Sequence, residues 1–198
     1  MSSIIFERFA DYILKKEKSK KNFVHKIINQ GDYEAKKDYY LQLRIKLINL
    51  LKKNKSLEEL DELISVVSSK KTNNYRVLIE NIQSFLKGRN YKWIDPQKGE
   101  INYSGLTVNV NPEIGLLIDG TTYYIKIYFK QQEISIKKVC ILEKIMQDFC
   151  KEENNNVKLA VWDIKRCKMH FKDSQEIINI DYDLNKEALN WLRYAAEE

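Results

Sequence analysis

The clearest alternation of hydrophobic and polar positions lies between residues 115 and 130. In an extended chain one face of residues 121–130 is apolar and aromatic, with Tyr123, Ile125, Ile127 and Phe129. The other face alternates tyrosine with lysine: Tyr124, Lys126, Tyr128 and Lys130. Asp119-Gly120 separates this run from the apolar residues 115–118, and this dipeptide is favoured in type I′ turns. We therefore predict an antiparallel hairpin of strands 115–118 and 121–130.

Residues 1–88 show helical periodicity instead, with apolar residues repeating every three or four positions. The pattern predicts helices over about 3–30, 32–54, 56–68 and 75–87, separated by Gly31, by a capping-box sequence at Ser56 to Glu59, and by a polar loop at 68–74. Gly88 follows the last helix in the position of a C-terminal cap. We expect a basic helical region over residues 1–88.

Strand signals dominate after residue 89. We predict a strand at 106–110, the hairpin, a helix from Ser135 to about 151, strands at 157–161, 167–171 and 177–180, and a last helix at 185–196. The expected fold class is α+β, in which an N-terminal helical region precedes a mainly antiparallel sheet with a crossover helix and a C-terminal helix. Residues 89–198 form the second predicted domain, organised on the 115–130 hairpin.

Composition narrows the class of protein. The chain is 43% hydrophobic and 31% charged, as is typical of a globular protein. Cys140, Cys150 and Cys167 lack C-x-x-C spacing, which argues against a disulfide framework and favours a reducing compartment. We see no signal peptide and no apolar run near the roughly 20 residues that cross a bilayer. The expected location is cytoplasmic, with no membrane partner and no small-molecule cofactor.

The positive charge is concentrated in the first half of the chain. Residues 1–90 contain 19 Lys and Arg against 11 Asp and Glu, whereas residues 91–198 contain 15 against 17. The densest run includes Lys15, Lys16, Lys20 and Lys21, which are candidates for contact with nucleic-acid phosphates. A solvated helix face gives the same pattern, so both interpretations stay open.

The order helix, three strands, helix and strand over about residues 75–165 resembles the core of the PD-(D/E)XK nuclease-like superfamily. In that family an acid after a proline opens one strand and an acid-x-Lys triplet follows on the next; here Pro112-Glu113 precedes Tyr124-Ile125-Lys126. The resemblance implies that Glu113 is a candidate metal ligand and catalytic residue and that Lys126 is a candidate catalytic residue, with Mg²⁺ or Mn²⁺ as the ion. Tyr124 stands where the second carboxylate is expected, and Glu133 and Glu143 are candidates to replace it.

The face formed by Tyr124, Lys126, Tyr128 and Lys130 admits two interpretations. Aromatic rings and lysines together bind single strands, since the rings stack bases and the lysines contact phosphates. Alternatively, the face lies under the crossover helix, with the rings in the core and the lysine stems reaching its edge.

Three functions follow as hypotheses. The first is a non-catalytic accessory or regulatory module with a nuclease-like fold that binds a nucleic acid or a nucleoprotein partner, in a setting such as bacterial or phage genome defence or a mobile element. The second is a divalent-metal-dependent nuclease whose second carboxylate has migrated. The third is a protein-interaction subunit that binds no nucleic acid.

Overall fold

The computed structural model describes residues 3–31, 38–150, 157–171 and 183–197. The first half contains strand β1 (Ser3–Ile5), helices α1 (Phe6–Ile13), α2 (Glu17–Ile28) and α3 (Leu41–Lys52), the 3₁₀ helix η2 (Leu57–Asp61), and helices α4 (Glu62–Val66) and α5 (Ser69–Leu86). The second half contains β2 (Tyr91–Trp93), β3 (Gly99–Tyr103), β4 (Leu106–Val110), β5 (Ile114–Ile118), β6 (Thr121–Tyr128), α6 (Ile136–Phe149), β7 (Val157–Asp163), η3 (Ile164–Arg166), β8 (Lys168–Phe171) and α7 (Leu184–Ala196). This arrangement confirms the predicted α+β class.

The strands form two mixed sheets. The larger sheet has the order β2-β5-β6-β7-β8, in which the parallel strands β6 and β7 are joined through the crossover helix α6. The smaller sheet has the order β1-β4-β3, in which β1 runs parallel to β4. The predicted hairpin is confirmed as β5 and β6, and its turn residues Asp119 and Gly120 have φ values of 47° and 85°, as a type I′ turn requires.

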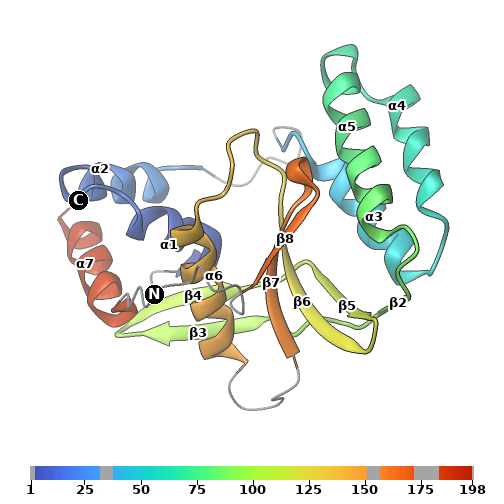
Figure 1. Ribbon diagram of the computed structural model, residues 1–198. Helices are drawn as coiled ribbons and strands as arrows, with labels where there is room; N and C mark the ends of the chain where they lie inside the picture. Colours follow the sequence, from blue (N-terminus) through green and yellow to red (C-terminus); the bar gives the residue numbers. More distant parts are fainter. Residues whose placement is uncertain (1–2, 32–37, 151–156, 172–182, 198) are drawn as a thin grey trace.

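Each face of the larger sheet covers a hydrophobic core (Figure 1). On one face α1, α2, α6, α7 and the smaller sheet pack around residues that include Tyr128 and Val161. On the other face α3, α4 and α5 cover Ile125, Ile127 and Trp162. Because successive side chains of a strand point to opposite faces, β6 and β7 contribute alternate residues to both cores. Both faces of the Tyr and Lys strand are therefore covered.

The structure corrects several predicted elements. Strands β1, β2 and β3 were not predicted, because the short edge strands carry no clear apolar alternation. Strand β4 joins the smaller sheet rather than the sheet of the predicted hairpin, in which β2 is the partner of β5. The expected loop at 68–74 is instead the first part of α5, where the carbonyl of Ser68 accepts from the Lys71 amide at 2.8 Å. The predicted strand at 177–180 lies outside the described residues.

The expected boundary near residue 88 is crossed by packing between the two halves. Strand β1 pairs with β4, and α2 packs against the C-terminal helix α7. The helical region also begins with a strand, so the described part of residues 1–88 is not wholly helical. This packing carries α1 across to the face of β6 that bears Lys126.

Candidate functional site

The cross-strand pair Glu113 and Lys126 forms the centre of the candidate site. Glu113 directly precedes β5, and the register that places Ile114 opposite Ile125 leaves Glu113 opposite Lys126. The Lys126 ammonium donates to Oε1 of Glu113. The amide of Ile127 donates to Oε2 of the same carboxylate at 3.0 Å, which fixes its orientation. The structure therefore brings together the two motif residues that the sequence singled out.

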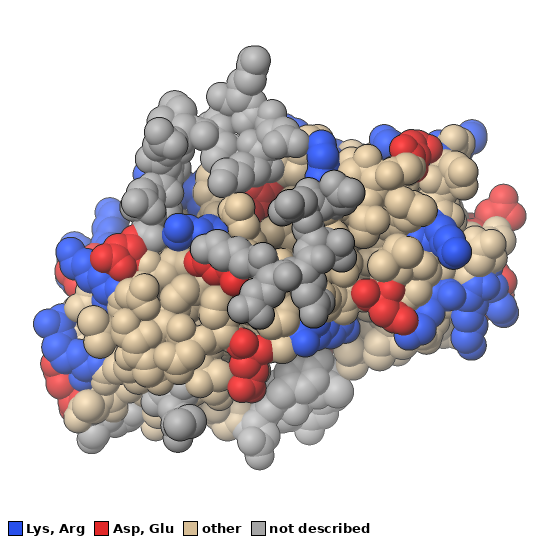
Figure 2. All heavy atoms as spheres, turned by 90° about the horizontal axis from the view of Figure 1, so that it is seen from below, with Lys and Arg blue, Asp and Glu red and all other residues tan. Residues whose placement is uncertain are grey.

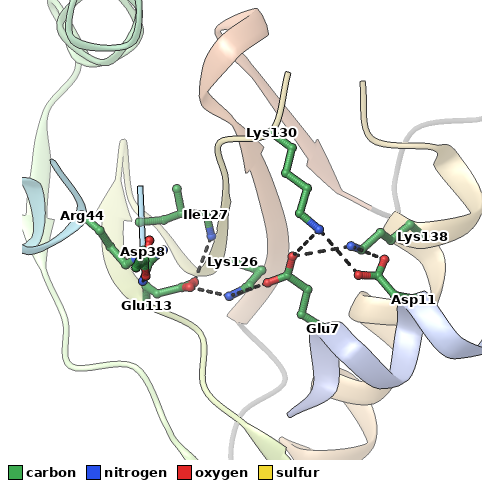
Figure 3. A network of polar contacts seen from close by, with 9 residues as sticks. All are labelled: Glu7, Asp11, Asp38, Arg44, Glu113, Lys126, Ile127, Lys130 and Lys138. Carbon is green, nitrogen blue, oxygen red and sulfur yellow. Dashed lines mark hydrogen bonds and ion pairs between the residues drawn. The ribbon is translucent and has the colours of Figure 1, made fainter. Parts of the chain in front are cut away.

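Helix α1 adds two carboxylates to this pair (Figure 3). Glu7 places Oε2 3.4 Å from the Lys126 ammonium and Oε1 3.3 Å from that of Lys130. One turn later on α1, Asp11 accepts from the Lys138 ammonium at 2.6 Å. Lys138 lies in the first turn of α6. We call the set Glu7, Asp11, Glu113, Lys126, Lys130 and Lys138 the ionic network; its three lysines and three carboxylates balance in charge.

The network is largely withdrawn from solvent, and burial sets its electrostatics. Lys126 is 8% exposed and Lys138 5%. Burial by itself would raise the pKa of Glu7, but Lys126, Lys138 and Lys130 outweigh it and lower that pKa to about 2. Burial would likewise lower the pKa of Lys126, yet Glu113 and Glu7 raise it instead. Both groups are therefore ionised at neutral pH.

A divalent cation at this site would have to displace the Lys126 ammonium. The Lys126 ammonium contacts both Glu113 and Glu7 and neutralises the carboxylates that an ion would need. Over the described residues, no cluster of three or more His, Cys, Asp and Glu side chains has a metal-binding arrangement. Of the two expected replacement carboxylates, Glu143 is buried on α6 and Glu133 is exposed before it. The further carboxylate that reaches Lys126 is Glu7, which sequence reasoning missed.

The tyrosines of β6 are not a base-stacking platform in this structure. Tyr124 and Tyr128 are each 7% exposed, and the hydroxyl of Tyr128 donates to the Gln132 carbonyl at 2.9 Å. The ammonium groups of Lys130 and Lys138 lie 5.9 and 5.7 Å from the centroid of the Tyr128 ring. These observations match the interpretation in which the rings belong to the core, and only Lys130 of this face is substantially exposed.

The N-terminal lysine run is divided between structural and exposed roles. Lys20 is 5% exposed, and its ammonium donates to both oxygens of Glu187 on α7 at 2.9 and 2.8 Å. Lys21 pairs with Glu197 at 2.8 Å. Lys15 lies over the Phe23 ring at 5.2 Å, and both Lys15 and Lys16 are exposed. Lys20 and Lys21 thus join α2 to the C-terminal segment, which leaves Lys15 and Lys16 accessible.

A second feature, on α3, was not recognised in the sequence. A surface pocket of about 380 Å³ is lined by one amide-rich and lysine-rich face of this helix and the turn after it: Gln42, Ile45, Lys46, Asn49, Leu50, Lys53 and Lys55. The sequence signal for this face was the spacing of polar residues opposite the buried stripe of Leu43, Leu47 and Leu51.

Figure 2 shows one face of the molecule, with Lys and Arg gathered towards both ends and interspersed with Asp and Glu.

Comparisons with protein-family models, with curated proteins and with solved structures found no match. Among the residues that the structure describes, no helix has both the length and the apolar character needed to cross a membrane. The case for a function therefore rests on the side chains themselves.

Proposed function

We propose that the protein is a non-catalytic accessory or regulatory module that binds a nucleic acid or a nucleoprotein partner through exposed basic residues of its helical region. The position of Lys126 is the observation that supports a non-catalytic role. Its ammonium lies against Glu113 and Glu7, so the motif residues are joined in a closed and charge-balanced network. A group held in this way stabilises the fold and is poorly placed for chemistry on a phosphate.

The charge of the surface supports binding to a nucleic acid or a nucleoprotein partner. The excess of Lys and Arg lies in residues 1–90, and many of these side chains, including Lys16, Lys53 and Lys70, are exposed. Exposed lysines release condensed counterions when they contact phosphates, which favours binding to polyanions. With Tyr124 and Tyr128 buried, the helical region is the better candidate for this contact.

Fluorescence anisotropy with labelled single- and double-stranded DNA and RNA tests the proposal. We expect binding at about 20 mM salt that weakens as salt rises, since each phosphate contact contributes a slope of about −0.7 to −0.9 in log K against log salt. An absence of binding at low salt, or an affinity independent of salt, contradicts it. Stoichiometric co-purification of a protein in that case favours a pure protein-interaction subunit.

One observation supports the alternative of a metal-dependent nuclease. Glu7 supplies a further carboxylate near Lys126, the feature that the sequence motif lacked. Incubation of labelled DNA and RNA with Mg²⁺ or Mn²⁺ decides between the two functions. Cleavage that disappears in Glu7→Gln, Glu113→Gln and Lys126→Met, each verified as folded by circular dichroism, supports the nuclease. No cleavage by the folded wild type supports the accessory module.

A further inference from the structure

The pocket on α3 has the chemical character of a nucleotide site. Building on the proposed function, we propose that this pocket binds one nucleotide, either free or in an unpaired stretch of nucleic acid. Lysine ammonium groups contact its phosphate, and side-chain amides contact the edge of its base. The ionic network and the pocket lie on different elements, so the two sites are tested separately.

Helical geometry places the required groups together. Gln42, Lys46 and Asn49 lie on one face of α3, and Lys53, the residue that caps the end of the helix, continues their spacing of three and four residues. The opposite face is fixed in the core by leucines that include Leu43 and Leu47, both fully buried. Helix α3 is thus anchored on one side and presents its amides and amines on the other.

The lysines of the pocket are available to an anion. Within the described part of the chain, Lys53 makes no ion pair and is exposed. Lys46 pairs with Glu62 at 2.5 Å, but the Glu62 side chain is 71% exposed. Lys55 pairs with Glu59 only at 3.8 Å. Surface ion pairs of this kind contribute little to stability because both charges stay hydrated, so a phosphate can compete for both lysines.

The remaining lining suits a base. Gln42 and Asn49 are exposed and, among the described residues, neither side chain forms a hydrogen bond. A carboxamide offers both a donor and an acceptor, which is the pattern that pairs with the edge of adenine. Ile45 is 50% exposed beside them and gives an apolar contact for the face of a ring. The volume of about 380 Å³ is at the small end of the roughly 300–1,000 Å³ of small-molecule sites.

The test uses the full chain and two kinds of probe. Calorimetry with AMP and dTMP measures free nucleotides, and anisotropy with labelled (dA)12 and (dT)12 measures unpaired strands. The pocket variant is Lys46→Gln/Lys53→Gln, and the matched control is Lys98→Gln/Lys137→Gln, which removes the same charge from exposed positions outside the helical region. All four side chains lie on the surface or its margin, and circular dichroism verifies that both variants fold.

For the strands we expect the pocket variant to bind about 10- to 100-fold more weakly at 50 mM salt, with a salt slope smaller by about 1.4, as two lost phosphate contacts require. The control is expected to retain wild-type affinity. Gln42→Ala/Asn49→Ala is expected to reduce any preference between adenine and thymine probes. Loss of AMP binding in the pocket variant identifies free nucleotides as ligands, whereas loss confined to the strands identifies nucleic acid.

Three outcomes overturn the inference. If the pocket variant binds with wild-type affinity, the pocket is not the binding site, while the proposed nucleic-acid function is unaffected. If the wild type binds no probe at 20 mM salt, both the pocket proposal and the proposed function are refuted. Binding of poly-L-glutamate that is lost in the pocket variant, without binding of nucleotides or strands, assigns the pocket to an acidic protein segment instead.

Discussion

Replacing Glu7 with glutamine isolates the electrostatic contribution of α1 to the ionic network. The substitution keeps the size of the side chain and removes the charge that faces Lys126, Lys130 and Lys138. The pKa of Glu7 falls from 4.5 to about 2 in the folded protein. Since one pKa unit is equivalent to about 1.4 kcal/mol, we expect Glu7→Gln to lower the free energy of unfolding by about 3 kcal/mol at pH 7.

The stabilisation by Glu7 depends on pH, and the direction of its pKa shift determines whether it grows or shrinks as pH falls. A carboxyl group whose pKa is lower in the folded state stabilises the fold above its unfolded pKa, here 4.5, and loses that effect as pH falls through the folded value of about 2. The difference between wild type and Glu7→Gln is therefore expected to shrink from about 3 kcal/mol at pH 7 to about 2 kcal/mol at pH 3.5. Urea unfolding followed by circular dichroism at several pH values measures it.

Glu58→Gln provides the matched control. Glu58 is exposed and, over the described residues, its side chain forms no ion pair. We expect a change within about 0.5 kcal/mol for this variant, as for most surface substitutions. A Glu7→Gln effect no larger than that of the control at pH 7, or one that grows as pH falls, would refute the electrostatic account of the network.

Three further predictions concern packing and reactivity. A Cβ on Gly115 would lie 2.2 Å from the Ile94 carbonyl oxygen, so Gly115→Ala is expected to cost about 3 kcal/mol. Gly120→Ala, with φ of +85° but open space, is expected to cost about 1 kcal/mol, and urea unfolding that ranks the two equally contradicts the close approach. Lys20→Met is expected to cost about 2–4 kcal/mol, because it leaves the carboxylate on α7 without its nearly buried partner; an unchanged urea midpoint would show the pair to be dispensable. Burial raises the pKa of the Cys150 thiol, so iodoacetamide at pH 8 should modify it more slowly than free cysteine, and an equal rate by mass spectrometry argues against its burial.

Local patterns predicted the elements whose signals are contained within a few residues. The Asp119-Gly120 turn and the alternation after it predicted β5 and β6, because turn chemistry and side-chain period act between near neighbours. The start of α6 followed in the same way from Ser135, whose hydroxyl accepts from the Lys138 amide at 3.2 Å. Strands β2 and β3 escaped prediction because edge strands gain their structure from a partner rather than from their own alternation.

In the candidate site, too, residues with a local sequence signal were predicted and residues brought in by distant packing were missed. Glu113 and Lys126 were singled out from the sequence by a resemblance that no comparison tests, and the hairpin places them opposite each other. Glu7 was missed because α1 reaches Lys126 only through the pairing of β1 with β4 and the packing of α1 on α6, which join distant parts of the chain. The α3 pocket was not predicted because its lining combines one polar face of the helix with the turn after it, and local periodicity does not show where a surface is hollowed.

The amino-acid sequence by itself determined the α+β class and the hairpin, since these depend on local periodicity and turn geometry. Only the tertiary structure decided whether the Tyr and Lys face of β6 meets solvent or core. Helices α1 and α6 cover that face, so its tyrosines became packing groups and Lys126 became the partner of two carboxylates. The physical reason is that burial and long-range ion pairing depend on which distant segments pack together. The alternation within a strand does not indicate which segments will cover it.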